Sequence, residues 1–184
     1  MPVIRGNSLY KVVYGTWEES QATSISLGGH LATINTEEEN RFITNSDLKE
    51  DVIYNSAKGD LSGNNPRVPR AWIGLNDIKN EGTYEWISGE PVTFRGTIDS
   101  HFSGENNTYG RFDPVSGFVD DSLPLISAYI NQDVAAIQLT NSKDSNGAWN
   151  SFWTAGSWED IWYNYTHMES GIAEIPFIRR GDSA

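Results

Sequence analysis

The chain has 184 residues, 38% of them hydrophobic and 12% aromatic, which is enough to bury one sizeable core. Its 25 acidic and 13 basic residues give a net charge of −12, so a phosphate backbone or an anionic membrane surface would be repelled. The absence of cysteine excludes disulfides, thiolate metal sites and cysteine nucleophiles. We expect one domain over residues 1–184, without nucleic acid as a partner and without membrane insertion, because no run of about 18 apolar residues occurs.

The first forty residues carry clear local signals. Residues 16–28 predict a helix, because Thr16 and Glu19 have capping-box spacing and Gly28 fits the C-terminal end. Around this helix we expect strands over residues 8–14 and 30–34, followed by a second helix over residues 36–43 with acidic residues in its first turn.

The middle of the chain is less regular. Residues 45–70 read as an irregular connection with room for one short helix, and residues 71–75 and 83–87 as strands joined by a turn. Residues 89–131 are rich in Gly, Asn, Asp and Ser and poor in periodicity, and a loop of that length inside a compact domain is usually functional. Two further strands are expected over residues 133–139 and 172–175.

Common catalytic motifs are absent from the sequence. It contains no Walker loop, no Gly-x-Ser-x-Gly, no His-Glu-x-x-His and no zinc-type histidine spacing, so we expect a protein that is not an enzyme. A glycosidase pair formed by Asp120 and Asp121 with Asp99 or Asp113 is the alternative, but nothing in the sequence fixes the separation of these carboxylates.

Four phrases in a fixed order carry a family resemblance. They are Gly-Gly-His-Leu-Ala-Thr-Ile at 28–34, Trp-Ile-Gly-Leu-Asn-Asp at 72–77, Trp-Glu-Asp-Ile at 158–161 and Gly-Ile-Ala-Glu-Ile-Pro at 171–176. Together they resemble a C-type lectin-like domain with its core over about residues 8–177. The resemblance implies an α+β fold in which two helices pack on small antiparallel sheets, with a long calcium-stabilised loop region. In this chain Ala173 stands at a position where the family usually has a cysteine. The lack of cysteine resembles bacterial or phage members of the family.

The resemblance also implies two calcium sites. In the sugar-binding branch, the principal calcium is held by a loop tripeptide, a later acidic residue and the end of a Trp-Asn-Asp phrase. The matching positions here are Glu105, Asn107, Gln132, Glu159 and Asp160. A second candidate for the last phrase is Trp149-Asn150-Ser151.

The auxiliary calcium site of some family members is matched more fully. It uses an aspartate and a glutamate four residues apart after the hallmark strand, plus an aspartate that opens a later strand. Asp77, Glu81 and Asp133 occupy these positions. Their oxygens are the ligands that calcium prefers, although an aspartate in a turn can also serve only as a cap.

The function that these residues imply is binding rather than catalysis. Beside the principal site, Tyr109, Trp153 and Trp162 could stack on sugar rings, or could belong to the core. We expect a calcium-dependent carbohydrate-binding module that mediates adhesion to a glycan, polysaccharide or cell surface. The alternative is a protein-recognition or receptor-binding module with structural calcium. Either would act outside the cell or on its surface, as a multimer or as part of a larger multidomain protein, although the sequence shows no signal peptide.

Overall fold

A computed structural model describes residues 1–58, 69–80, 82–97, 101–104, 108–113, 117–119, 133–141, 154–161 and 170–177. Within these residues the helices are α1 (Trp17–Ser26), α2 (Glu37–Asn45) and α3 (Leu48–Lys58). The strands are β1 (Val3–Arg5), β2 (Ser8–Tyr14), β3 (His30–Leu31), β4 (Arg70–Asn76), β5 (Glu85–Trp86), β6 (His101–Gly104), β7 (Thr108–Asp113), β8 (Gly117–Val119), β9 (Val134–Gln138), β10 (Trp158–Ile161) and β11 (Ser170–Pro176).

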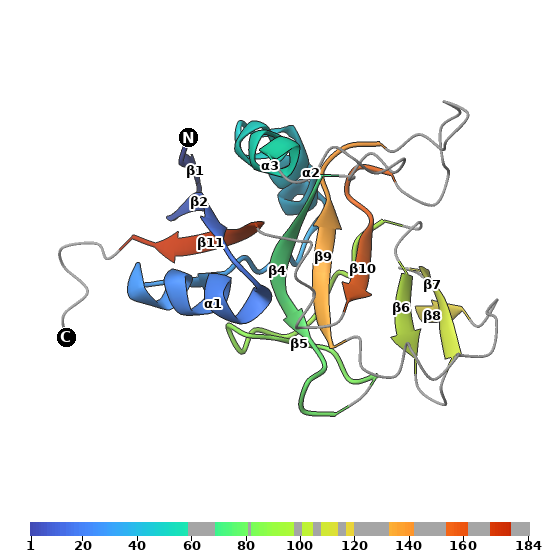
Figure 1. Cartoon of the computed structure of the whole chain (residues 1–184). Helices are drawn as coiled ribbons and strands as arrows, with labels where there is room; N and C mark the ends of the chain where they lie inside the picture. Colours follow the sequence, from blue (N-terminus) through green and yellow to red (C-terminus); the bar gives the residue numbers. More distant parts are fainter. Residues whose placement is uncertain are drawn as a thin grey trace, which may run out of the picture.

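The strands form one continuous sheet in the order β1-β2-β11-β4-β9-β10-β6-β7-β8, with β3 paired to β11 and β5 to β4 (Figure 1). Most neighbours are antiparallel, but β11 with β4 and β10 with β6 are parallel. The expected small antiparallel sheets are therefore joined into one mixed sheet. Near the two ends of the chain, β2 pairs with β11 from Ser8 opposite Pro176 to Tyr14 opposite Ser170.

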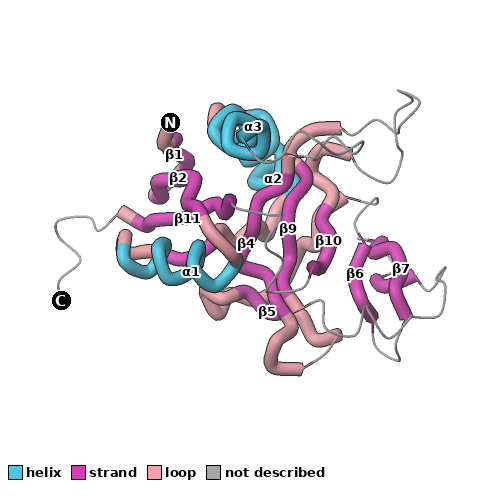
Figure 2. The backbone as a smooth tube through the Cα atoms, viewed as in Figure 1, coloured by secondary structure: helices cyan, strands magenta, loops and turns pink. Residues whose placement is uncertain are grey.

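The helices cover both faces of this sheet. Figure 2 shows α1 running beside β11, while α2 and α3 lie together on the other side of β2. One core cluster joins α2 and α3 to the sheet through Ile43, Leu48 and Val52. A second cluster, around Trp17 and Trp72, lies under α1. No helix in the described part of the chain is long and apolar enough to cross a bilayer.

The two predicted helices form where their capping signals lie. At the start of α1, the Thr16 side chain accepts a hydrogen bond from the Glu19 amide at 3.3 Å, and the Glu19 carboxylate accepts one from the Thr16 amide at 2.9 Å. In α2, Thr36 caps the Glu39 amide at 3.2 Å, and three glutamates fill the first turn. Helix α3 fills part of the connection that the sequence left mostly irregular.

Two predictions about strands need correction. The strand expected over residues 30–34 is only His30–Leu31. The residues after it form isolated hydrogen bonds instead of a ladder; for example, the Ala32 amide donates to the Ile172 carbonyl. The stretch 89–131, expected to lack regular structure, contains the antiparallel strands β6, β7 and β8. Figure 1 shows these three strands at the far end of the molecule from both termini.

Strand β4 is the centre of the core, since every residue from Ala71 to Asn76 is buried. It lies between β11 and β9, so both of its edges are paired and both of its faces are covered. The residue that follows it, Asp77, is also buried. The Asp77 carboxylate therefore lies in the protein interior, at the end of a fully buried strand.

Candidate functional site

The candidate site begins with Asp77, whose side chain is 1% exposed. Its Oδ2 accepts a hydrogen bond from the Gly82 amide at 2.8 Å, and its own amide donates to the Asp133 carbonyl at 3.0 Å. The other oxygen, Oδ1, is buried and has no hydrogen-bond partner among the described residues. The turn after β4 thus packs against the start of β9, and Oδ1 of Asp77 stays without a hydrogen bond from the described residues.

The electrostatics of this corner are unfavourable for negative charge. Burial raises the pKa of Asp77 to about 6, and the nearby charge of Asp133 adds to the rise, while the bond from Gly82 opposes it. Burial also raises the pKa of Asp133. A cation between the two carboxylates would relieve both effects, because it stabilises the ionised form of each. The arrangement fits a hard cation bound by oxygen ligands.

Tyr84 extends this corner towards β10. Its side chain is buried, and its hydroxyl donates to Oδ2 of Asp160 at 2.6 Å. The nearby Tyr84 side chain also lowers the pKa of Asp77 slightly, against the larger effect of burial. The Arg95 guanidinium lies 5.8 Å from the centre of the Tyr84 ring, and burial lowers its pKa. Asp160 therefore belongs to the same buried polar group as Asp77.

Glu159 lies on the other face of β10. Consecutive side chains of a strand point to opposite faces, and Glu159 is opposite Ala136 while Asp160 is opposite Ala135. The Glu159 carboxylate is buried and forms an ion pair with Arg70 of β4. The structure therefore does not bring these two predicted ligands of the principal site together.

The remaining site predictions are placed as follows. Tyr109 lies in β7, opposite Ser103 of β6. The described residues contain no group of three or more His, Cys, Asp or Glu side chains that could hold a metal ion. Outside the described residues lie Glu81, Glu105, Asn107, Gln132, Trp153 and Trp162, together with the alternative phrase at 149–151 and Asp99, Asp120 and Asp121 of the glycosidase alternative.

Helix α2 holds β10 in place through Asn40, a residue that the sequence analysis missed. Asn40 is 2% exposed, donates to the Gly156 carbonyl at 2.9 Å and accepts from the Trp158 indole at 2.8 Å. The helical period could have pointed to it, because Asn40 lies three residues before the buried Ile43 and so shares its face. This contact fixes the start of the strand that carries Asp160.

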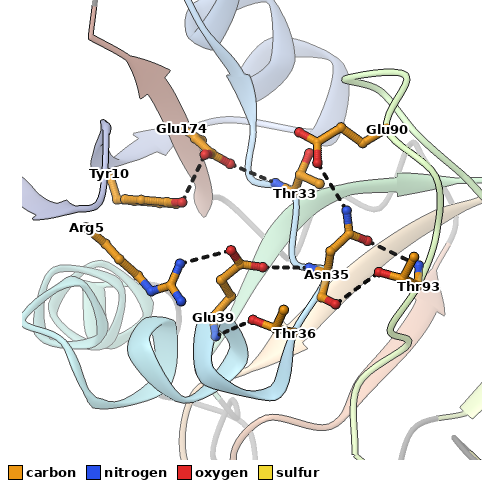
Figure 3. A network of polar contacts seen from close by, with 9 residues as sticks. All are labelled: Arg5, Tyr10, Thr33, Asn35, Thr36, Glu39, Glu90, Thr93 and Glu174. Carbon is orange, nitrogen blue, oxygen red and sulfur yellow. Dashed lines mark hydrogen bonds and ion pairs between the residues drawn. The ribbon is translucent and has the colours of Figure 1, made fainter.

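Asn35, just before α2, holds residues 88–97 in a similar way (Figure 3). Its side-chain oxygen accepts a hydrogen bond from the Trp86 indole at 2.9 Å. As Figure 3 shows, the same oxygen accepts from the Thr93 backbone amide at 3.3 Å, and the side-chain amide donates to Glu90 at 3.2 Å. The rings of Trp86 and Trp158 meet edge to face at 5.7 Å. The two asparagines and the two indoles thus join α2, β5 and β10.

A second polar network, also drawn in Figure 3, lies beside the contacts of Asn35. The Tyr10 hydroxyl donates to Glu174 at 2.9 Å, and the Thr33 amide donates to the same carboxylate at 3.2 Å. Burial, together with the charge of Glu174, raises the pKa of Tyr10. Arg5 donates to Glu39 at 2.9 Å on the α2 side. This network links β1, β2 and β11 to α2 and leaves the Asp77 corner separate.

Curated relatives of the chain are animal lectins. The chain is 35% identical over 80 residues to "Galactose-specific lectin nattectin" of Thalassophryne nattereri, covering 44% of this chain and 42% of that protein. It is 33% identical over 110 residues to "Lectin BRA-3" of Megabalanus rosa, covering 57% and 56%. The chain spans about half the length of the curated relatives it matches. Because these relatives come from animals, the bacterial or phage character stays a prediction.

Solved structures share the fold at low identity. The carbohydrate-recognition domain of cow CD23, solved in the presence of a GlcNAc2Man3 oligosaccharide, matches with a TM-score of 0.54 at 13% identity over 96% of this chain and 94% of that one. A calcium-independent type II antifreeze protein matches with a TM-score of 0.52 at 17% identity, over 96% and 92%. At such identities these matches show the fold alone.

A family model places the chain. The model described as "Lectin C-type domain" matches residues 14–112, which is more than half of the chain. This stretch contains both capped helices, strand β4 and Asp77, whereas Asp133 lies beyond it. The chain therefore belongs to the C-type lectin domain family.

Proposed function

We propose that the chain is a calcium-dependent carbohydrate-binding module that mediates adhesion to a glycan-bearing surface outside the cell. The observation that carries this proposal is the buried Asp77 carboxylate near Asp133, with one oxygen that has no partner among the described residues. We assign Asp77, Asp133 and Glu81 as the ligands of the bracing calcium. When bound, calcium would supply the positive charge that this corner lacks.

The fit to calcium follows from the donor set. Asp77 and Asp133 offer carboxylate oxygens, which calcium prefers, and both have a raised pKa because burial disfavours the ionised form. The backbone bond between Asp77 and Asp133 holds the β4 turn and the start of β9 together. A cation here would therefore strengthen a contact between residues 56 positions apart in the chain.

For the glycan, the proposal keeps the predicted principal site. The site consists of the predicted ligands and three aromatic residues that would stack on sugar rings. The ligands are Glu105, Asn107, Gln132, Glu159 and Asp160, and the aromatic residues are Tyr109, Trp153 and Trp162. The support is the family and the lectin names of the curated relatives, one of which is called galactose-specific. One shallow sugar site typically binds with millimolar affinity, about −4 kcal/mol, so useful adhesion requires several copies or further modules.

The second candidate function is protein recognition with calcium only as a brace. The observation that favours it is the ion pair between Glu159 and Arg70, which occupies one of the predicted principal ligands. A principal site without Glu159 offers fewer charged oxygens to calcium. In that case the auxiliary corner would still bind calcium, while the binding surface would recognise a protein.

The experiment that tests the proposal combines calorimetry with glycan retention. Calcium is titrated into the wild type and the variant Asp77→Asn, with Asp47→Asn as a matched control because Asp47 is exposed near the start of α3. We expect the wild type and the control to bind calcium and Asp77→Asn to lose one site. Retention on glycan-coated beads is then measured with chelator and with free monosaccharide.

The outcomes separate the two candidates. Retention that is lost with chelator and with monosaccharide supports the lectin. Calcium binding without glycan retention supports the protein-recognition module. The absence of any calcium binding in the wild type would refute both forms of the proposal that include calcium.

A further inference from the structure

The hairpin formed by β6 and β7 is joined to the rest of the sheet by a short pairing. Among the described residues, β6 pairs with β10 through one residue pair, Glu159 opposite His101. Strand β7 carries Tyr109, a predicted sugar-stacking residue, and the residues between the two strands include Glu105 and Asn107. One pair does not fix the direction of a strand, so the placement of this hairpin depends on the segment that leads into it.

Residues 88–97 lead into this hairpin, and Asn35 holds them (Figure 3). Its side-chain oxygen accepts from the Thr93 amide at 3.3 Å, and its backbone carbonyl accepts from the Thr93 hydroxyl at 3.1 Å. Its side-chain amide donates to Glu90 at 3.2 Å. Asn35 is itself fixed to the first turn of α2, because its own backbone amide donates to the Glu39 carboxylate at 2.8 Å. Three hydrogen bonds from the segment therefore converge on one anchored residue.

The two residues after Thr93 pack on aromatic rings. The Phe94 ring meets the Trp158 ring edge to face at 5.5 Å, and the Arg95 guanidinium lies 5.8 Å from the centre of the Tyr84 ring. Trp158 is the first residue of β10, the strand that pairs with β6. The segment is therefore held by α2 on one side and by the strand next to the hairpin on the other.

We propose that Asn35 is a positioning residue that holds residues 88–97 against β10 and thereby sets the placement of the β6–β7 hairpin. The proposal rests on the proposed function for its consequence, which is that glycan binding depends on this placement. It goes beyond that function because Asn35 is a predicted ligand of neither calcium nor sugar. When a binding placement is populated for only a fraction of the time, the apparent affinity falls by that fraction.

The first test needs no ligand and uses amide NMR in chelator. In Asn35→Ala, the Thr93 amide should exchange with solvent at least about tenfold faster than in the wild type, and the amide signals of β6 and β7 should shift. The matched control is Thr36→Ala, which removes the cap on the Glu39 amide but leaves the bonds to Thr93 in place. In the control, exchange at Thr93 should stay within about twofold of the wild type.

The second test measures sugar binding to immobilised protein, with galactose and mannose titrated in calcium. Asn35→Ala should raise the sugar Kd at least about threefold without lowering the maximal signal. A loss of folded protein alone would lower the maximal signal and leave the Kd unchanged. Because Asn35→Ala also removes the acceptor of the Trp86 indole, Thr93→Val is measured beside it, since this change removes only the hydroxyl bond to Asn35. Thr93→Val should also raise the Kd, whereas Thr36→Ala should not.

The results distinguish this proposal from the one before it. Equal exchange at Thr93 in Asn35→Ala and Thr36→Ala, or unshifted signals of β6 and β7, would overturn the positioning role whether or not a sugar binds. If the wild type binds sugar and Asn35→Ala leaves the Kd unchanged, the positioning role is refuted and the proposed function stands. If the wild type binds neither sugar, the proposed function loses its support, and the ligand-free measurements alone decide whether Asn35 places the hairpin.

Discussion

Replacement of Asp77 by Asn should change the pH dependence of stability in the calcium-free protein. The pKa of Asp77 is raised from 3.8 to about 6, so the folded state binds this proton more tightly than the unfolded state does. The stability that comes from this proton is complete below about pH 4 and is lost as the pH rises through 6. A rise of about two units corresponds to about 3 kcal/mol at neutral pH.

The assay is urea unfolding in chelator at pH 4 and pH 7.5 for the wild type, Asp77→Asn and the exposed control Asp47→Asn. Asn cannot ionise, so from pH 4 to pH 7.5 the wild type should lose up to about 3 kcal/mol relative to Asp77→Asn. The control should follow the wild type. Calcium should largely cancel this loss at pH 7.5, because at 100 times Kd it adds about 2.7 kcal/mol to the wild type and nothing to a variant without the site.

Two results would refute this reasoning. If the wild type and Asp77→Asn have parallel pH profiles in chelator, the Asp77 carboxyl does not carry a raised pKa. If calcium stabilises both proteins equally, Asp77 is not a ligand. The two results are independent, so the electrostatic argument and the metal assignment are tested separately.

Three further substitutions test the packing around the site by urea unfolding. Glu159→Ala removes an ion-pair partner of the half-buried Arg70 and should cost up to about 3 kcal/mol. An equal loss in Glu159→Gln would show that the charge matters more than the shape, and a loss near zero in both variants would contradict the ion pair. Asn40→Ala removes both the acceptor of the Trp158 indole and the donor to the Gly156 carbonyl, and it should cost about 2 kcal/mol or more. A loss near zero would contradict the assigned bonds. Gly29→Ala would place a Cβ 2.0 Å from the Glu174 backbone oxygen in β11 and should cost about 2 kcal/mol or more. A smaller loss would show that β11 shifts easily to make room.

Local signals predicted the helices well. The Thr16 and Glu19 pair marks the start of α1 because both partners lie within one turn, and the capping box forms as expected. The strands β6 to β8 were missed because their residues show no clear alternation. The parallel pairing of β11 with β4 could not be read either, since it depends on contacts between distant parts of the chain.

In the candidate site, too, some residues could be predicted from the sequence and others could not. Asp77 and Asp133 could be selected because they match positions of the auxiliary calcium site in the family that the sequence resembles, and the structure joins them through one backbone bond. The engagement of Glu159 by Arg70 and of Asp160 by Tyr84 joins residues that are far apart in the sequence. Such pairings follow from the sheet order and have no local signature.

The pairing of β2 with β11 sets how the domain responds to mechanical force. Ser8 at the start of β2 lies opposite Pro176 at the end of β11, so tension on the two ends first peels away β1 and then loads this one residue pair. Hydrogen bonds loaded in this way break one after another, instead of sharing the load as in a shear geometry. A domain that holds a surface against flow would thus unzip at low force from its termini, while the Asp77 corner, on the far side of β4, would be among the last parts to feel the pull.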